Sequence, residues 1–85
     1  MYYIARHLKN KTEYLLGVEI KGCAPDPEPN FSINLLTVSL DDGEVVDDII
    51  DALLVFERIE SAWSLLSTIC HLGVPSAGFC VCGFD

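Results

Sequence analysis

The feature that most constrains the fold is a stretch of twenty-nine residues, from Glu44 to Leu72, that contains neither Gly nor Pro. Within it, apolar residues follow one another at alternating spacings of four and three, which is the spacing of a continuous helical seam. The seam consists of Val45, Ile49, Ala52, Phe56, Ile59, Trp63, Leu66 and Cys70. The pattern predicts that a third of the chain is helical.

A helical wheel with about 100° between neighbours gives this stretch two different apolar faces. In residues 44–56 the acidic side chains gather on one side of the wheel, and in residues 59–72 apolar side chains occupy that same side. We therefore expect one long kinked helix or two shorter helices, with a break at residues 58–61 and Ser61 as the second N-cap. Gly73 marks the far end of the helical stretch.

The rest of the chain has strand patterns. Two alternating segments flank a polar turn, which predicts a hairpin. The third strand changes parity at Leu35 and Leu36, which indicates a bulge or a strand that is buried on both faces. Residues 22–30 contain three prolines and are expected to form a connecting surface loop. The four expected strands are residues 2–8, 13–21, 31–40 and 78–84.

These elements predict a single α+β domain over residues 1–85. The expected architecture is a small antiparallel sheet of about four strands in the order β-β-β-α(α)-β. One long kinked helix or two shorter helices would pack on one face of this sheet.

The chain is acidic, with 13 Asp and Glu against 5 Lys and Arg, a net charge of -8 and a pI near 4.4. Such a charge repels nucleic acid and anionic membranes, so neither is an expected direct partner. The longest apolar run, residues 52–56, is too short to cross a membrane, and early charges interrupt any export signal. We expect a cytoplasmic protein with reduced thiols at Cys23, Cys70, Cys80 and Cys82.

Six carboxylates gather where the predicted helix begins, at Asp41, Asp42, Glu44, Asp47, Asp48 and Asp51. Asp41 and Glu44 have the spacing of a capping box. On a helix, residues three and four apart lie ~5 to 6 Å from each other, which is comparable to the step between nucleic-acid phosphates. This ladder predicts a partner-binding face for a basic protein surface. The alternative is a solvated face that has no partner.

The cysteines and histidines suggest two further alternatives. Cys80-x-Cys82, together with Cys70, His71 and Cys23, makes zinc an alternative, but zinc knuckles place paired cysteines two to four residues apart. We expect core thiols there instead, with no metal or cofactor. Cys70 and His71 point about 100° apart on a helix and do not face one another, so no catalytic residue and no enzymatic activity are expected.

In size and charge the chain resembles small acidic inhibitors from phages and mobile elements, including anti-restriction and anti-CRISPR proteins and toxin immunity proteins. The resemblance concerns composition, so it assigns no functional residue. The leading hypothesis is a nucleic-acid mimic that docks its acidic helix onto a basic, nucleic-acid-binding surface of a partner protein. The alternative is a self-associating structural or adaptor module, in which the second apolar stripe forms a homodimer seam. A zinc-stapled domain is the third hypothesis.

Overall fold

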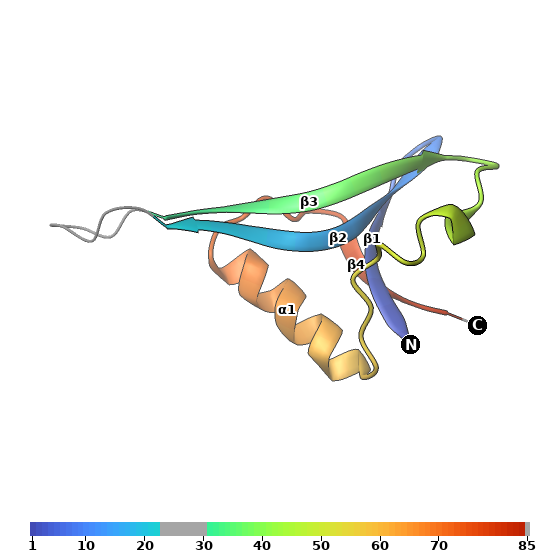
Figure 1. Ribbon diagram of the computed structural model, residues 1–85. Helices are drawn as coiled ribbons and strands as arrows, with labels where there is room; N and C mark the ends of the chain where they lie inside the picture. The colour runs from blue at the N-terminus through green and yellow to red at the C-terminus, as the bar shows by residue number, and fades with distance from the viewer. Residues whose placement is uncertain (23–30, 85) are drawn as a thin grey trace, which may run out of the picture.

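The structure is a computed structural model that describes residues 1–22 and 31–84. It contains four strands, one α-helix and one short 3-10 turn (Figure 1). In chain order these are β1 (Tyr2–His7), β2 (Lys11–Gly22), β3 (Phe31–Asp41), η1 (Val46–Asp48), α1 (Ile59–His71) and β4 (Phe79–Gly83). Most of the expected proline-rich loop falls on residues 23–30, outside the described residues.

The four strands form one antiparallel sheet in the order β3-β2-β1-β4. The register between β2 and β3 shifts once, because Leu15 faces Thr37 while Gly17 faces Leu36. Leu16 is therefore an extra residue on β2, which is the pattern of a β-bulge. The sequence indicates a bulge on β3, at Leu35 and Leu36. The structure has the bulge on β2 instead, opposite Leu36.

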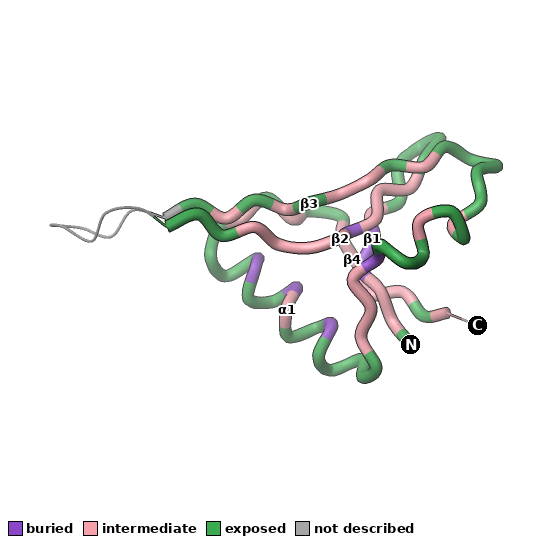
Figure 2. The backbone as a smooth tube through the Cα atoms, in the orientation of Figure 1, coloured by how far each residue is buried: buried purple, intermediate pink, exposed green. Residues whose placement is uncertain are grey.

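The core lies between α1 and one face of the sheet. Ile4 of β1 and Leu15 of β2 are 1% exposed, and they cluster with Ala62 and Leu66 of α1. Figure 2 shows that the buried positions of α1 lie on its side toward the sheet. Ala62 and Leu66 are four residues apart, so they lie on the same side of the helix. Burial of these apolar side chains is the main stabilising contribution that joins the helix to the sheet.

The C-terminal end of α1 is formed by Gly73, as the sequence predicts. Gly73 has a φ of 79°, in the left-handed region that favours glycine. Its amide donates to the carbonyl of Cys70 at 3.1 Å, and the amide of Val74 donates to the carbonyl of Ile69 at 3.1 Å. These two bonds form a Schellman motif, which satisfies carbonyl groups that the last turn leaves free.

The predicted fold class is wrong in its helical part. Neither one long kinked helix nor two shorter helices are present among the described residues, because α1 is a single helix of 13 residues. Residues 44–58 contain only η1, turns and extended backbone. The helix begins at Ile59 with Arg58 at the N-cap, so the predicted N-cap at Ser61 is wrong as well.

Local propensity and tertiary pairing explain why the first half of the seam is not helical. It is rich in Val, Ile and Asp, which have low helix propensity, and carboxylates such as Asp47 and Asp51 would repel one another at i,i+4. Its end is held extended instead. Phe56 forms an isolated antiparallel bridge with Tyr2, and the amide of Leu54 donates to the carbonyl of Leu15 at 3.3 Å. Pairing with the sheet therefore overrides the helical spacing.

The described residues contain no helix with the length and apolar character needed to cross a lipid bilayer.

Candidate functional site

The six carboxylates predicted to bind a partner are all exposed. Asp41 is the last residue of β3, and Asp47 and Asp48 belong to η1. Asp42, Glu44 and Asp51 lie in the connections around them. We call residues 41–51 the acidic segment. It leaves the end of β3 and lies on the other side of β1 from α1 (Figure 1), so the carboxylates occupy a turn-rich loop and not a helical ladder.

The acidic segment begins with a closed turn. The amide of Glu44 donates to the carbonyl of Asp41 at 3.0 Å, and the amide of Asp41 donates to Glu44 Oε1 at 3.1 Å. The second bond is the one that a glutamate makes in a capping box. Gly43, inside this turn, has a φ of 95°, and Val45, after the turn, is extended. The motif therefore closes a turn without starting an α-helix.

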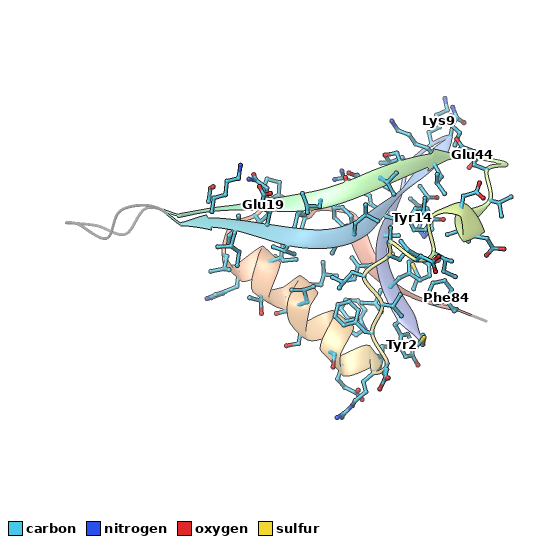
Figure 3. The ribbon with its side chains drawn as sticks, in the orientation of Figure 1. Tyr2, Lys9, Tyr14, Glu19, Glu44 and Phe84 are labelled. Carbon is cyan, nitrogen blue, oxygen red and sulfur yellow. The ribbon has the colours of Figure 1, made fainter. Side chains whose placement is uncertain are left out.

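Two basic side chains lie near the beginning of the acidic segment. Lys11 faces Asp41 in the register of β2 and β3, and Lys9 lies at the same end of the molecule as Glu44 (Figure 3). The salt bridges of the described residues join Arg6 to Glu13, Lys21 to Glu19 and Arg58 to Glu60, and none involves the acidic segment. The segment's negative charge is therefore available to a partner.

Apolar side chains are exposed within the same segment. Val45 is 56% exposed and Ile50 is 38% exposed. Ile50 also lines an open hollow of about 760 Å³, which brings together the chain start, the acidic segment and the residue after β4. The hollow is lined by Met1, Asp47, Ile50, Val55 and Phe84. An apolar patch with a charged rim is the usual composition of a protein–protein interface.

A second group of side chains that can bind a ligand comes from β1 and β4. In the register of these strands Ala5 faces Cys80 and Tyr3 faces Cys82, and His7 follows Ala5 on the same face of β1. This is the face opposite the one that packs Ile4 against α1. The alternation of the strands thus gathers one imidazole and two thiols from opposite ends of the sequence.

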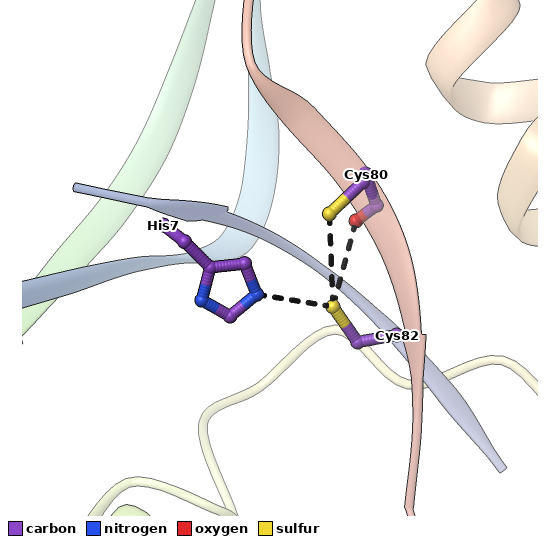
Figure 4. Close-up of side chains that lie close together, drawn as sticks. All are labelled: His7, Cys80 and Cys82. Carbon is purple, nitrogen blue, oxygen red and sulfur yellow. Dashed lines mark hydrogen bonds between the residues drawn. The ribbon is translucent and has the colours of Figure 1, made fainter.

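The three side chains are close together (Figure 4). Cys80 Sγ and Cys82 Sγ are 3.9 Å apart, and Cys82 Sγ is 3.7 Å from His7 Nε2. All three potential ligand atoms lie within 4.8 Å of one another. Cys80 Sγ also lies 3.5 Å from the carbonyl oxygen of Ala5, to which the thiol donates. We call His7, Cys80 and Cys82 the thiol–imidazole cluster.

Burial disfavours negative charge in this cluster. Burial, and then the neighbouring Cys80, raise the pKa of Cys82 to about 11. Burial, and then the nearby Cys82, raise the pKa of Tyr3 to about 12. At neutral pH the Cys82 side chain is therefore a neutral thiol, unless a cation takes the place of its proton.

The histidine beside Cys80 and Cys82 is His7 and not His71, the histidine that the zinc alternative grouped with them. Cys70 and His71 are both exposed on α1, whereas the imidazole beside the thiols is that of His7. The available signal was the alternation of residues 2–8 and 78–84, which places His7 and both thiols on one face once β1 and β4 are known to be neighbours. Cys23 lies outside the described residues.

A partly buried ion pair lies on the face of the sheet opposite the thiol–imidazole cluster. Arg6 of β1 forms a salt bridge with Glu13 of β2, and Thr37 Oγ1 donates to Glu13 Oε2 at 2.8 Å. The Arg6 guanidinium also lies 4.7 Å from the centre of the Phe79 ring. Burial favours a higher pKa for Glu13, but the hydrogen bond from Thr37 and the ion pair with Arg6 outweigh it and lower the pKa.

Comparison of the chain with models of protein families, with curated proteins and with solved structures finds no match.

Proposed function

We propose that this protein is a small acidic inhibitor that docks the acidic segment onto a basic, nucleic-acid-binding surface of a partner protein. The observation that carries the proposal is the presence of six exposed carboxylates outside every described salt bridge, beside the exposed apolar residues Val45 and Ile50. The segment acts as a turn-rich loop, which replaces the acidic helix expected from the sequence.

The charge pattern supports a basic partner. Complementary charges accelerate association and exclude wrong partners, while an apolar centre slows dissociation. In this proposal Asp47, Asp48 and Asp51 contact lysine and arginine side chains that otherwise hold phosphates, and Ile50 packs against the partner between them. Binding of this kind weakens with salt, because exposed charges are screened.

The test is affinity capture from the native host, followed by measurement of the captured partner's affinity. The test variant is Asp47→Asn/Asp48→Asn/Asp51→Asn, and the control is Glu19→Gln/Glu57→Gln/Glu60→Gln, which removes three charges outside the segment. We expect the test variant to bind about tenfold more weakly, as the loss of three exposed charge pairs implies. The control should bind like the unmodified protein, and duplex DNA should compete for the same partner.

Two results would overturn the proposal. One is an unchanged affinity of the Asp47→Asn/Asp48→Asn/Asp51→Asn variant. The other is an equal loss in both triple variants, which would mean that net charge matters and the position of the segment does not. An affinity that does not change between low and high salt would contradict the charged contacts in particular.

A self-associating module is the second candidate, because part of the apolar side of α1 remains exposed. Ile59 is 40% exposed, and Trp63, four residues later on the same side of the helix, is 50% exposed. Trp is a frequent anchor residue in interfaces. We expect Trp63→Glu to shift any dimer toward monomer in sedimentation experiments, while Ser61→Glu, at an exposed position about 160° away around the same helix, serves as the control. A monomer over the whole micromolar range would exclude this candidate.

We further propose that the protein works in the cytoplasm and without catalysis. Free thiols at Cys70, Cys80 and Cys82 support a reducing compartment.

A further inference from the structure

We propose that His7, Cys80 and Cys82 form a binding site for one zinc ion. Thiolate sulfur and imidazole nitrogen are the donors that zinc prefers, whereas hard cations such as Mg²⁺ and Ca²⁺ prefer oxygen. The inference does not rest on the proposed docking function.

The distances in the thiol–imidazole cluster fit a tetrahedral zinc ion. With Zn–S bonds of ~2.3 Å and a Zn–N bond of ~2.0 Å, tetrahedral angles place two sulfur ligands about 3.8 Å apart and a sulfur and a nitrogen about 3.5 Å apart. The corresponding distances are 3.9 Å between the two sulfur atoms and 3.7 Å between Cys82 Sγ and His7 Nε2. The remaining pair, Cys80 and His7, lies within 4.8 Å. Tetrahedral coordination requires this last distance to be shorter, and the exposed imidazole of His7 is free of the packing that would prevent it from turning.

A neighbouring residue orients the imidazole. Thr12 faces His7 across β1 and β2, and its Oγ1 lies 3.4 Å from His7 Nδ1. When Nδ1 carries the proton and donates it to Thr12, Nε2 has a free lone pair directed at Cys82. Metal-bound histidines usually have such a hydrogen-bond partner on their second nitrogen.

The charge balance suits a partly buried site. Binding replaces the two thiol protons, which leave to solvent, and the two thiolates and one neutral imidazole then surround the divalent cation. The resulting unit has no net charge, so its burial costs far less than that of an isolated thiolate. Three protein ligands leave one tetrahedral position for a water molecule. The strand pairing of β1 and β4 supplies the site, which explains why the one-residue spacing of Cys80 and Cys82 does not resemble a zinc knuckle.

The test is a zinc titration of the reduced, metal-free full chain against a chromophoric chelator, with native mass spectrometry to count bound ions. We expect one zinc ion per chain. His7→Gln, Cys80→Ser and Cys82→Ser should each weaken zinc binding by more than about 100-fold, since loss of an outer-shell partner alone costs 10- to 100-fold. Cys70→Ser is the matched control, because this thiol is exposed on α1 and outside the cluster. Its zinc affinity should equal that of the unmodified protein.

Cobalt provides a second measurement, because Co²⁺ bound by thiolates in a tetrahedral site has intense visible absorption that His7→Gln should remove. His7 is exposed, so this variant should keep the circular dichroism spectrum of the folded chain even if a cysteine variant does not fold. Unchanged zinc binding in His7→Gln would overturn the proposal. An equal loss in Cys70→Ser, or a Cys80–Cys82 disulfide in the protein isolated from cells, would also overturn it.

Discussion

The amide of Tyr2 donates to the carbonyl of Phe56, and the amide of Phe56 donates back to the carbonyl of Tyr2, at 2.8 Å in both directions. This reciprocal pair is possible only when the backbone around Phe56 is extended. It holds the end of the loop beside β1, immediately before α1 begins at Ile59. The position of this bridge therefore decides where helical structure can start.

A proline substitution at Glu57 tests where α1 begins. Glu57 is exposed and lies between the bridged Phe56 and the N-cap Arg58, so Glu57→Pro should leave the helical circular dichroism signal unchanged. An extended residue before proline is favourable. Ser64→Pro, inside α1, should destabilise the fold by about 3 kcal/mol and reduce the helical signal. A large loss of helical signal in Glu57→Pro would mean that the helix extends further toward the N-terminus.

Truncation of Leu15 tests the core. Leu15 is 1% exposed and packs in the cluster between the sheet and α1. Leu15→Ala should lower the free energy of unfolding by about 3 kcal/mol, through lost burial and the cavity left behind. Ile20, on the same strand, is 68% exposed, so Ile20→Ala should change it by less than about 0.5 kcal/mol. Urea unfolding measures both. Equal effects at the two positions would contradict the assignment of the core.

Replacement of Glu13 tests the ion pair with Arg6. Because the pKa of Glu13 is lowered in the folded state, its carboxylate stabilises the fold above the unfolded pKa of about 4.3. That contribution is lost as the pH falls through the lower folded value. Glu13→Gln should therefore be less stable than the unmodified protein by about 1 kcal/mol at pH 7. The difference should shrink as the pH falls below about 4.3 in urea unfolding, and a constant difference would contradict the ion pair.

Glycine substitutions test the end of α1. Gly73 has a φ of 79° within the Schellman motif, so Gly73→Ala should destabilise the protein by about 1 kcal/mol. At Gly22 no heavy atom of the described residues lies within 4 Å of an added Cβ and the φ is not in the left-handed region, so Gly22→Ala should be close to neutral. Thermal unfolding of both variants gives the comparison. A destabilised Gly22→Ala with an unchanged Gly73→Ala would reverse the expectation.

Thiol alkylation tests the environment of Cys82 in the metal-free protein. Since the pKa of Cys82 is raised to about 11, only about one thiol in a thousand is ionised at pH 8. Its alkylation by iodoacetamide, followed by peptide mass mapping, should accelerate about tenfold per pH unit up to pH 11. A rate that levels off below pH 9 would show that the thiol is not shifted. Cys70, exposed on α1, serves as the internal reference.

Strand positions and the end of α1 could be predicted because they depend on neighbouring residues. The alternation of residues 13–21 falls within β2, and Gly73 ends the helix as expected. The prediction of a helix over the first half of the seam failed, because the spacing of its apolar residues fits a helix while its β-branched and acidic residues favour other structure. The bond from Leu54 to Leu15 decides between them, and it joins residues thirty-nine positions apart. No local pattern reports such a pairing.

The candidate sites show the same division. Exposure of Asp47 and Asp48 could be expected from their charge, but their place on a 3-10 turn depends on how the loop returns to β1. His7 and Cys82 are separated by almost the whole sequence and become neighbours because β4 pairs with β1. Strand order, which decides this contact, is a property of the whole sheet.

The strand order also leaves β3, eleven residues long, at one edge of the described sheet. An edge strand has backbone amides and carbonyls on one side that a second chain can pair with, and long edges of this kind promote aggregation. The net charge of -8 keeps copies of the chain apart at neutral pH. At the isoelectric point near pH 4.4 that repulsion disappears while the open edge remains, so acidification should join molecules through β3 and precipitate the protein before it unfolds.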